Sequence, residues 1–305
     1  MRIFVTGASG WIGSALVPKL VQGNHQVVAL ARSDASAAAL VSAGAEVLRG
    51  DIDDLDTLRG GADRSDGVIH LAFKHDVVFS PAGMAAAAWT DRQAIDAIGE
   101  TLAGSDRPFV VASGTPAVPG RVATERDEPS AVGPAAPRGA NAQAVIAMAA
   151  RGVRSSVVRL PRSVHGQGDG HGFIARLIAI AREKGVSGYV GEGSSRWPAV
   201  HVLDAAQLFC LAVENAQPES VLHAVGDEGV PTREIAAVIG RRLNMPTASV
   251  PAEDFGFLGM VLAGDAPASS ALTRELLGWR PVQPGLIDDL DKGHYFDLGA
   301  KGLRG

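Results

Sequence analysis

The 305-residue sequence has one cysteine and two tyrosines, and none of its apolar stretches approaches the length of a membrane span. Because Cys210 has no second thiol, an internal disulfide and a cysteine-rich metal site are excluded, and we expect this side chain in the core. The net charge of −5 comes without a long basic run, which argues against a nucleic-acid partner. No basic and apolar leader precedes the first apolar run, so we expect a cytoplasmic protein without a membrane partner.

Glycine, in contrast, is abundant, and a glycine-rich turn at residues 6–13 reads Thr-Gly-Ala-Ser-Gly-Trp-Ile-Gly. Gly7 permits a tight backbone conformation, Gly10 lets the chain approach a pyrophosphate, and Gly13 lets the following helix pack close to the strand. A short apolar run precedes the turn, and a helix-forming segment up to Leu20 and a second apolar run follow it, as a dinucleotide-binding βαβ unit requires. We predict that this turn holds the phosphates of a dinucleotide; the alternative is a purely structural turn.

Short apolar runs alternate with alanine- and leucine-rich stretches along the chain. Strands are expected at residues 3–5, 26–30, 45–48, 67–71, 109–112, 155–160 and 221–225, and helices at 11–20, 55–59, 82–102, 141–151, 173–184, 235–243 and 269–277. The strands are almost continuously apolar, which indicates that both faces of the sheet are covered. The pattern predicts an α/β protein with a Rossmann-type, doubly wound parallel sheet.

Glycine-rich loops become frequent after residue 165 and suggest a change of domain. We assign residues 1–170 to a dinucleotide-binding Rossmann domain, to which the chain returns at about 197–226. Residues 171–196 and 227–305 are expected to form a smaller C-terminal lobe that binds the substrate.

Five motifs occur in order along most of the chain. They are Thr6-Gly7-x-x-Gly10-x-x-Gly13, Gly50-Asp51-Ile52, His70-Leu71-Ala72, Ala112-Ser113-Gly114 and Arg159-Leu160-Pro161-x-x-Val164-His165-Gly166. In these motifs the sequence resembles the extended short-chain dehydrogenase/reductases, also described as the NAD-dependent epimerase/dehydratase superfamily. The resemblance implies that Asp51 contacts the adenine, that the Leu71-Ala72 backbone lines the cofactor channel, and that the segment after Pro161 borders the nicotinamide.

The second predicted strand ends in Ala31-Arg32-Ser33, where an enzyme specific for NAD usually has an acidic residue for the ribose hydroxyls. A guanidinium at this point can pair with a 2′-phosphate, whereas a carboxylate would repel it. We therefore expect NADP(H) rather than NAD(H). The alternative is that Arg32 is a solvated surface residue and that Asp34 binds the ribose.

The family that the sequence resembles normally has a tyrosine and a lysine four residues apart on the helix before the sixth strand, and this chain lacks both. Its tyrosines lie beyond that helix, and no lysine occurs between Lys74 and Lys184. By spacing, Arg138 stands at the lysine position and Pro134 at the tyrosine position. A guanidinium can hold a ribose hydroxyl or stabilise an oxyanion, but it is a poor proton donor.

Other side chains must therefore orient the substrate and deliver a proton. Ser113, at the end of the fifth strand, is the expected substrate-orienting hydroxyl; the alternative is a turn former before Gly114. His165 is the first candidate proton donor, and His75 and His201 are the others, although each can equally be a hydrogen-bonded structural residue. His165 also lies near Asp169 and His171, but we expect no metal in this glycine-rich loop.

We predict NADPH-linked reduction of a small carbonyl substrate, with Ser113, Arg138 and His165 as the catalytic residues. Two alternatives remain: a non-catalytic NADP(H)-binding redox sensor, and a sugar epimerase or dehydratase, which is weaker because those reactions use the missing tyrosine and lysine. A homodimer through the helices at 82–102 and 141–151 is a further expectation, although these helices could equally cover the sheet. The expected cofactor-binding residues are Gly7, Ser9, Gly10, Trp11, Ile12, Gly13, Arg32, Asp51, Ile52, Leu71, Ala72, Ser113, Arg138, Pro161 and Val164.

Overall fold

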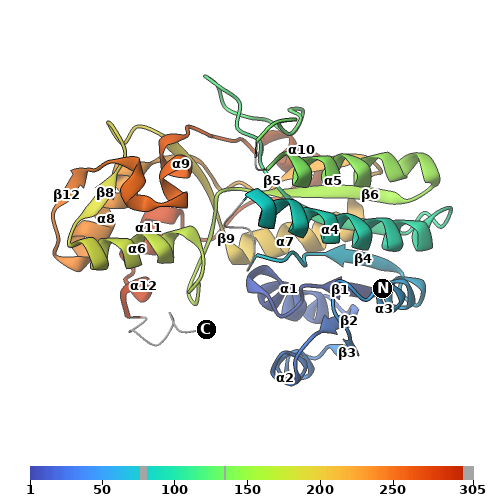
Figure 1. Ribbon diagram of the computed structural model, residues 1–305. Helices are drawn as coiled ribbons and strands as arrows, with labels where there is room; N and C mark the ends of the chain where they lie inside the picture. Colours follow the sequence, from blue (N-terminus) through green and yellow to red (C-terminus); the bar gives the residue numbers. More distant parts are fainter. Residues whose placement is uncertain (76–80, 134, 298–305) are drawn as a thin grey trace.

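The computed structural model describes residues 1–75, 81–133 and 135–297, and its centre is a parallel sheet in the strand order β10-β6-β5-β4-β1-β2-β3 (Figure 1). All neighbouring strands of this sheet run parallel. The strands are β1 (Arg2–Thr6), β2 (Gln26–Ala31), β3 (Glu46–Arg49), β4 (Gly67–His70), β5 (Pro108–Gly114), β6 (Arg154–Leu160) and β10 (Ser220–His223). The predicted α/β class and the Rossmann-type sheet are confirmed.

Helices cover both faces of this sheet. One face carries α1 (Trp11–Gln22), α2 (Asp34–Ser42) and α7 (Val202–Asn215); the other carries α3 (Leu55–Asp63), α4 (Pro81–Leu102) and α5 (Ala136–Ala147). Along β1 the side chains alternate between the two cores, so that Ile3 and Val5 pack on the α1 side and Phe4 on the α4 side. This double burial explains why the strands are almost continuously apolar.

The dimer predicted through α4 and α5 remains a prediction, because the structure shows only how these helices meet the sheet. Ile95 and Ile98 of α4 and Val145 of α5 are fully buried in the core beneath them.

None of the helices in the described residues is long and apolar enough to cross a membrane.

A lobe beside the sheet contains the remaining short strands and most of the C-terminal helices, and it lies to the left in Figure 1. Its own core includes Ile174, Trp197, Ile239 and Leu286. The strands β7 (Ser163–His165), β9 (Arg196–His201) and β11 (Asp227–Pro231) form one small sheet, and β8 (Ser187–Tyr189) pairs with β12 (Thr247–Ser249). The helices are α6 (Phe173–Lys184), α8 (Thr232–Leu243), η2 (Ala252–Phe255), α9 (Phe257–Ala263), α11 (Leu286–Asp291) and α12 (His294–Asp297), while α10 (Ala271–Leu277) packs near β10.

Several element boundaries differ from the prediction for local reasons. The helix α2 was not expected, because only Leu40 of its residues is buried and no apolar stripe marks it, although Ser33 caps its N-terminus by accepting a hydrogen bond from the Ser36 amide. The predicted helix at 141–151 begins earlier, at Ala136. Its last turn is a separate 3₁₀ segment, η1 (Met148–Arg151), which Gly152 ends with a φ of 72°.

Candidate functional site

The glycine-rich turn between β1 and α1 has the close backbone contacts that its sequence predicts. Gly7 has a φ of 67°, and a Cβ atom there would lie 2.6 Å from the amide nitrogen of Ala72. A Cβ on Gly13 would lie 2.3 Å from the Gly7 carbonyl oxygen, so the start of α1 can pack on the turn only without a side chain. Gly10 forms the uncapped N-terminus of α1 and leaves amide groups available to a phosphate. Ser9 is exposed and Ile12 is half-buried in this turn.

The turn is tied to a second predicted cofactor segment by Trp11. Its indole Nε1 donates a hydrogen bond to the carbonyl oxygen of Val164 in β7, at 2.8 Å. Pro161 is buried just before that strand. The structure therefore brings residues 10–13 and 161–164 together, although they are far apart in the sequence.

The end of β2 carries Arg32, whose guanidinium side chain is 70% exposed and lies 3.9 Å from a carboxylate oxygen of Asp51. The Asp51 carboxylate also accepts a hydrogen bond from the Ile52 amide at 2.6 Å, which fixes its direction. Asp34, the alternative ribose ligand, instead pairs with Arg49 at 2.9 Å. Arg32 and Arg49 thus bring two positive charges to the edge of the sheet where β2 and β3 end.

The carboxyl ends of β1, β4 and β5 form the floor of the candidate site. Leu71 and Ala72 follow β4 and donate their amides to the backbone and side-chain oxygens of Thr6, at 3.1 and 3.3 Å. Ser113 is buried near the end of β5 and stands opposite Arg159 of β6. In open parallel sheets ligands bind at this edge, so the predicted position of Ser113 is compatible with contact to a substrate.

Arg138 lies on the first turn of α5, and its guanidinium carbon is 4.2 Å from the ring centre of Phe73. Its Nε atom is buried and has no hydrogen-bond partner. Burial lowers the pKa of Arg138, and the carboxylate of Asp91 opposes this shift. The guanidinium stays protonated at neutral pH because its ordinary pKa is far higher. Pro134, the residue at the tyrosine position, lies outside the described residues.

A buried chain of hydrogen bonds links the glycine-rich turn to α5, and the sequence did not reveal it. The Thr6 hydroxyl lies 2.7 Å from Nδ1 of His70, whose Nε2 lies 3.2 Å from one Asp91 oxygen. The other Asp91 oxygen accepts from the Asn141 side-chain amide at 2.7 Å. Because a carboxylate only accepts, Nε2 of His70 donates to Asp91, and in that neutral tautomer Nδ1 accepts the bond from the Thr6 hydroxyl.

His165 has no exposed surface, and its Nδ1 lies 2.9 Å from a carboxylate oxygen of Asp289 in α11. Burial alone would raise the pKa of Asp289, but the hydrogen bond from His165 and the nearby imidazoles of His294 and His201 hold it below its usual range. The His165 ring also packs edge-on against His201, with ring centres 5.4 Å apart. The bond to Asp289 links α11 to β7, while the buried Nε2 of His165 has no hydrogen-bond partner in the described residues. The role of His165 as a proton donor stays a prediction, and the mechanism proposed below does not use it.

The remaining histidines near the site differ in exposure. His75 is exposed, and its ring centre lies 5.1 Å from that of Phe73, on which Arg138 also rests. His201 uses its Nδ1 to accept a hydrogen bond from the Leu203 amide at the start of α7. Within the described residues, no group of three or more histidine, cysteine, aspartate or glutamate side chains is arranged to hold a metal ion. Asp169 accepts hydrogen bonds from the Tyr295 hydroxyl and the Gly172 amide.

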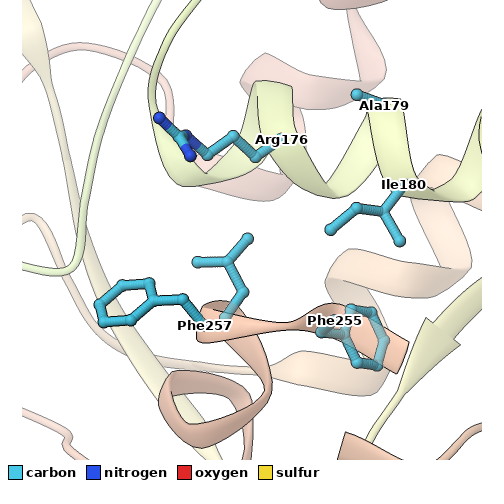
Figure 2. Close-up of a pocket in the computed structure, with 6 residues that line it drawn as sticks. Arg176, Ala179, Ile180, Phe255 and Phe257 are labelled. Carbon is cyan, nitrogen blue, oxygen red and sulfur yellow. The ribbon is translucent and has the colours of Figure 1, made fainter. Parts of the chain in front are cut away.

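An apolar cavity of about 210 Å³ lies within the C-terminal lobe, between α6 and the segment formed by η2 and α9. Figure 2 shows Phe255 and Phe257 on that segment, across the pocket from Arg176, Ala179 and Ile180 of α6. The full lining consists of Arg176, Ala179, Ile180, Phe255, Phe257 and Leu258. None of the predicted catalytic residues lines this cavity; the candidate active site is therefore the carboxyl edge of the central sheet.

Comparison with known proteins agrees with this geometry. Residues 3–224 match the model of the NAD dependent epimerase/dehydratase family. An uncharacterized protein of Schizosaccharomyces pombe is 45% identical over 302 residues, covering 97% of this chain and 100% of that protein. A 4-hydroxy-2-methyl-3-oxo-4-farnesyl-3,4-dihydroquinoline-1-oxide ketoreductase of Stigmatella aurantiaca is 26% identical, covering 93% and 82% of the two chains. The crystal structure of UDP-glucose 4-epimerase from Thermotoga maritima with UDP-glucose has the same fold, with a TM-score of 0.78 at 20% identity, covering 97% of this chain and 98% of that chain.

Proposed function

Because the chain belongs to the NAD dependent epimerase/dehydratase family, we propose that it is an NADPH-dependent oxidoreductase that reduces a small carbonyl substrate. The observation that carries this proposal is the chemistry of the side chains at the sheet edge. Ser113 and Arg138 are hydrogen-bond donors, and neither is a base at neutral pH. Such a pair suits a reaction in which negative charge develops on an oxygen atom, as it does when a carbonyl group is reduced.

The absence of a base from the pair Ser113 and Arg138 also favours reduction over the epimerase and dehydratase reactions of the family. Those reactions begin by removing a proton from a hydroxyl group, which requires a base close to the nicotinamide. The bound cofactor would supply a hydride to the carbonyl carbon. The Ser113 hydroxyl and the Arg138 guanidinium would donate hydrogen bonds to the oxygen, and a water molecule would supply the proton. The ketoreductase relative is in accord with this chemistry.

The preference for NADPH rests on the charges where β2 and β3 end. Asp34, the carboxylate that could receive a ribose hydroxyl, is engaged by Arg49, while the Arg32 side chain remains 70% exposed. A 2′-phosphate near Arg32 would gain charge-assisted hydrogen bonds. Because this guanidinium is exposed, solvent weakens the interaction. We expect its contribution to the binding free energy at the lower end of about 1.5–3 kcal/mol.

Fluorescence titration with NADPH and NADH tests the cofactor preference. The Arg32→Ala variant should bind NADPH about tenfold more weakly, with little change for NADH, since about 1.4 kcal/mol corresponds to a factor of ten. Arg151→Ala is a matched control, because this exposed arginine lies at the opposite edge of the sheet, beside Gly104. Equal losses for both cofactors would contradict the proposed role of Arg32.

Oxidation of NADPH in the presence of a panel of aldehydes and ketones tests the reaction. With the best substrate of the panel, Ser113→Ala should lower kcat about 100-fold, because an oxyanion donor contributes roughly that factor. Ser113→Thr keeps the hydroxyl and should retain more of the rate. An unchanged kcat in Ser113→Ala would remove Ser113 from the mechanism, and NADPH binding without turnover of any carbonyl compound would favour the sensor alternative.

A further inference from the structure

Arg138 is a half-buried arginine whose Nε has no partner, and the chemistry proposed above does not by itself require this. The guanidinium group rests on Phe73, and its Nε is buried without a partner. Throughout the described residues, no carboxylate or carbonyl oxygen accepts a hydrogen bond from this side chain. Of the five N–H donors of this arginine, the one on Nε is buried without an acceptor, and leaving it unpaired costs free energy.

The nearest carboxylate, that of Asp91, does not fill this role. One of its oxygens lies 3.2 Å from His70 Nε2 and the other accepts from the Asn141 amide at 2.7 Å. The Asp91 carboxylate therefore stabilises the positive charge of Arg138 through space but accepts no hydrogen bond from it. Since the described part of the chain offers these donors no acceptor, they are available to a bound group.

The position of Arg138 indicates the chemical class of the group that it binds. Phe73 follows Leu71 and Ala72, whose backbone touches the glycine-rich turn at Gly7. The guanidinium thus lies at the carboxyl edge of the sheet, where the substrate carbonyl must meet the cofactor under the proposed function. The guanidinium fork matches a carboxylate with two parallel hydrogen bonds, and its charge favours an anion over a neutral acceptor.

We propose that Arg138 binds a carboxylate group of the substrate, so that the substrate is an oxo acid whose carbonyl lies close to its carboxylate. This inference rests on the proposed function and names its substrate class. The carbonyl carbon gains a hydride from NADPH, the oxygen gains a proton from water, and the carboxylate is unchanged. NADPH is oxidised and the oxo acid is reduced to a hydroxy acid. Ser113 is then the principal donor to the carbonyl oxygen.

Calorimetric titration of the NADPH-saturated protein with oxamate tests the carboxylate site, and oxamide is the neutral counterpart. The wild type should bind oxamate at least tenfold more tightly than oxamide. Arg138→Met, which keeps an apolar stem on Phe73, should lose at least tenfold in oxamate affinity, and Arg138→Lys should lose less. Asp91→Asn removes the opposing charge and should tighten oxamate binding. Arg151→Ala should leave it unchanged.

Other outcomes would overturn the inference. Failure of the wild type to bind oxamate, equal binding of oxamide, or undiminished oxamate binding by Arg138→Met would each show that Arg138 is not a carboxylate site. If Arg138→Met instead weakens NADPH binding, the guanidinium serves the cofactor. These results are separable from the proposed function, because reduction of a neutral ketone by NADPH would leave that function intact. Circular dichroism of each variant checks that the fold is retained.

Discussion

Asp91 is the centre of the buried hydrogen-bond chain, and replacing it tests how strongly this chain holds α4 and α5 to the glycine-rich turn. Asp91→Ala leaves the Nε2–H of His70 without an acceptor. It also leaves one N–H of the Asn141 amide unpaired, because the Ala88 carbonyl satisfies only the other. All three side chains are buried, so water cannot take the place of the carboxylate without rearrangement.

The size of the effect follows from these two donors. An unsatisfied buried donor costs about 1–3 kcal/mol, so Asp91→Ala should lower the free energy of unfolding by about 2–6 kcal/mol. Asp91→Asn should cost less than about 2 kcal/mol, since its oxygen can accept from Asn141 while its amide donates to Nε2 of His70. This requires His70 to carry its proton on Nδ1 and to donate to Thr6, which the 2.7 Å contact permits.

Urea unfolding followed by tryptophan fluorescence measures both variants, with the slope of the transition checked for constancy. A loss below about 1 kcal/mol in Asp91→Ala would refute the assignment, because that is less than a single unpaired buried donor should cost. Equal losses in the two variants would also refute it, since the amide would then have failed to rebuild the chain.

Three further predictions concern other parts of the molecule. Gly13→Ala should weaken NADPH binding at least tenfold in a titration, because its Cβ would lie 2.3 Å from the Gly7 oxygen; Gly60→Ala, with its nearest neighbour at 3.5 Å, should bind normally. Burial lowers the pKa of His223 from 6.5 to about 4, so the unfolded chain takes up a proton in that range that the folded chain does not. The free energy of unfolding should therefore fall as the pH decreases from 6.5 to 4, and less so in His223→Asn; parallel pH profiles would contradict this. Burial raises the pKa of Cys210 to about 12, so a thiol reagent should label it only in urea, and rapid labelling of the native protein would disprove its burial.

The sequence predicted the central sheet because its signals are local. Each strand is a short apolar run, and the order of glycine turn, helix and second strand leaves few alternatives for β1, α1 and β2. The short strands of the lobe gave no such signal. The strands β7, β8 and β12 have three residues each, which is too few to establish an alternating pattern, and only their partners define them.

The site divides in the same way between local and long-range information. The steric need for Gly7 and Gly13 follows from the turn itself, whereas the predicted helix start at residue 141 left out Arg138, which lies on the first turn of α5. The contacts that decide what these residues do join distant segments. The bond between His165 and Asp289 spans 124 residues, and that between Asp91 and Asn141 spans 50. Buried polar partners at such separations follow from packing, which one sequence does not encode visibly.

Transfer of deuterium from NADPH labelled at the transferable position tests the central claim most directly. The protein is incubated with the labelled cofactor and a cell metabolite extract, boiled protein serves as the control, and mass spectrometry identifies labelled products. We predict one predominant labelled hydroxy compound, formed by the wild type and strongly reduced in Ser113→Ala. Absence of any labelled product, with NADPH shown to be bound under the same conditions, would contradict the assignment of an NADPH-dependent carbonyl reductase.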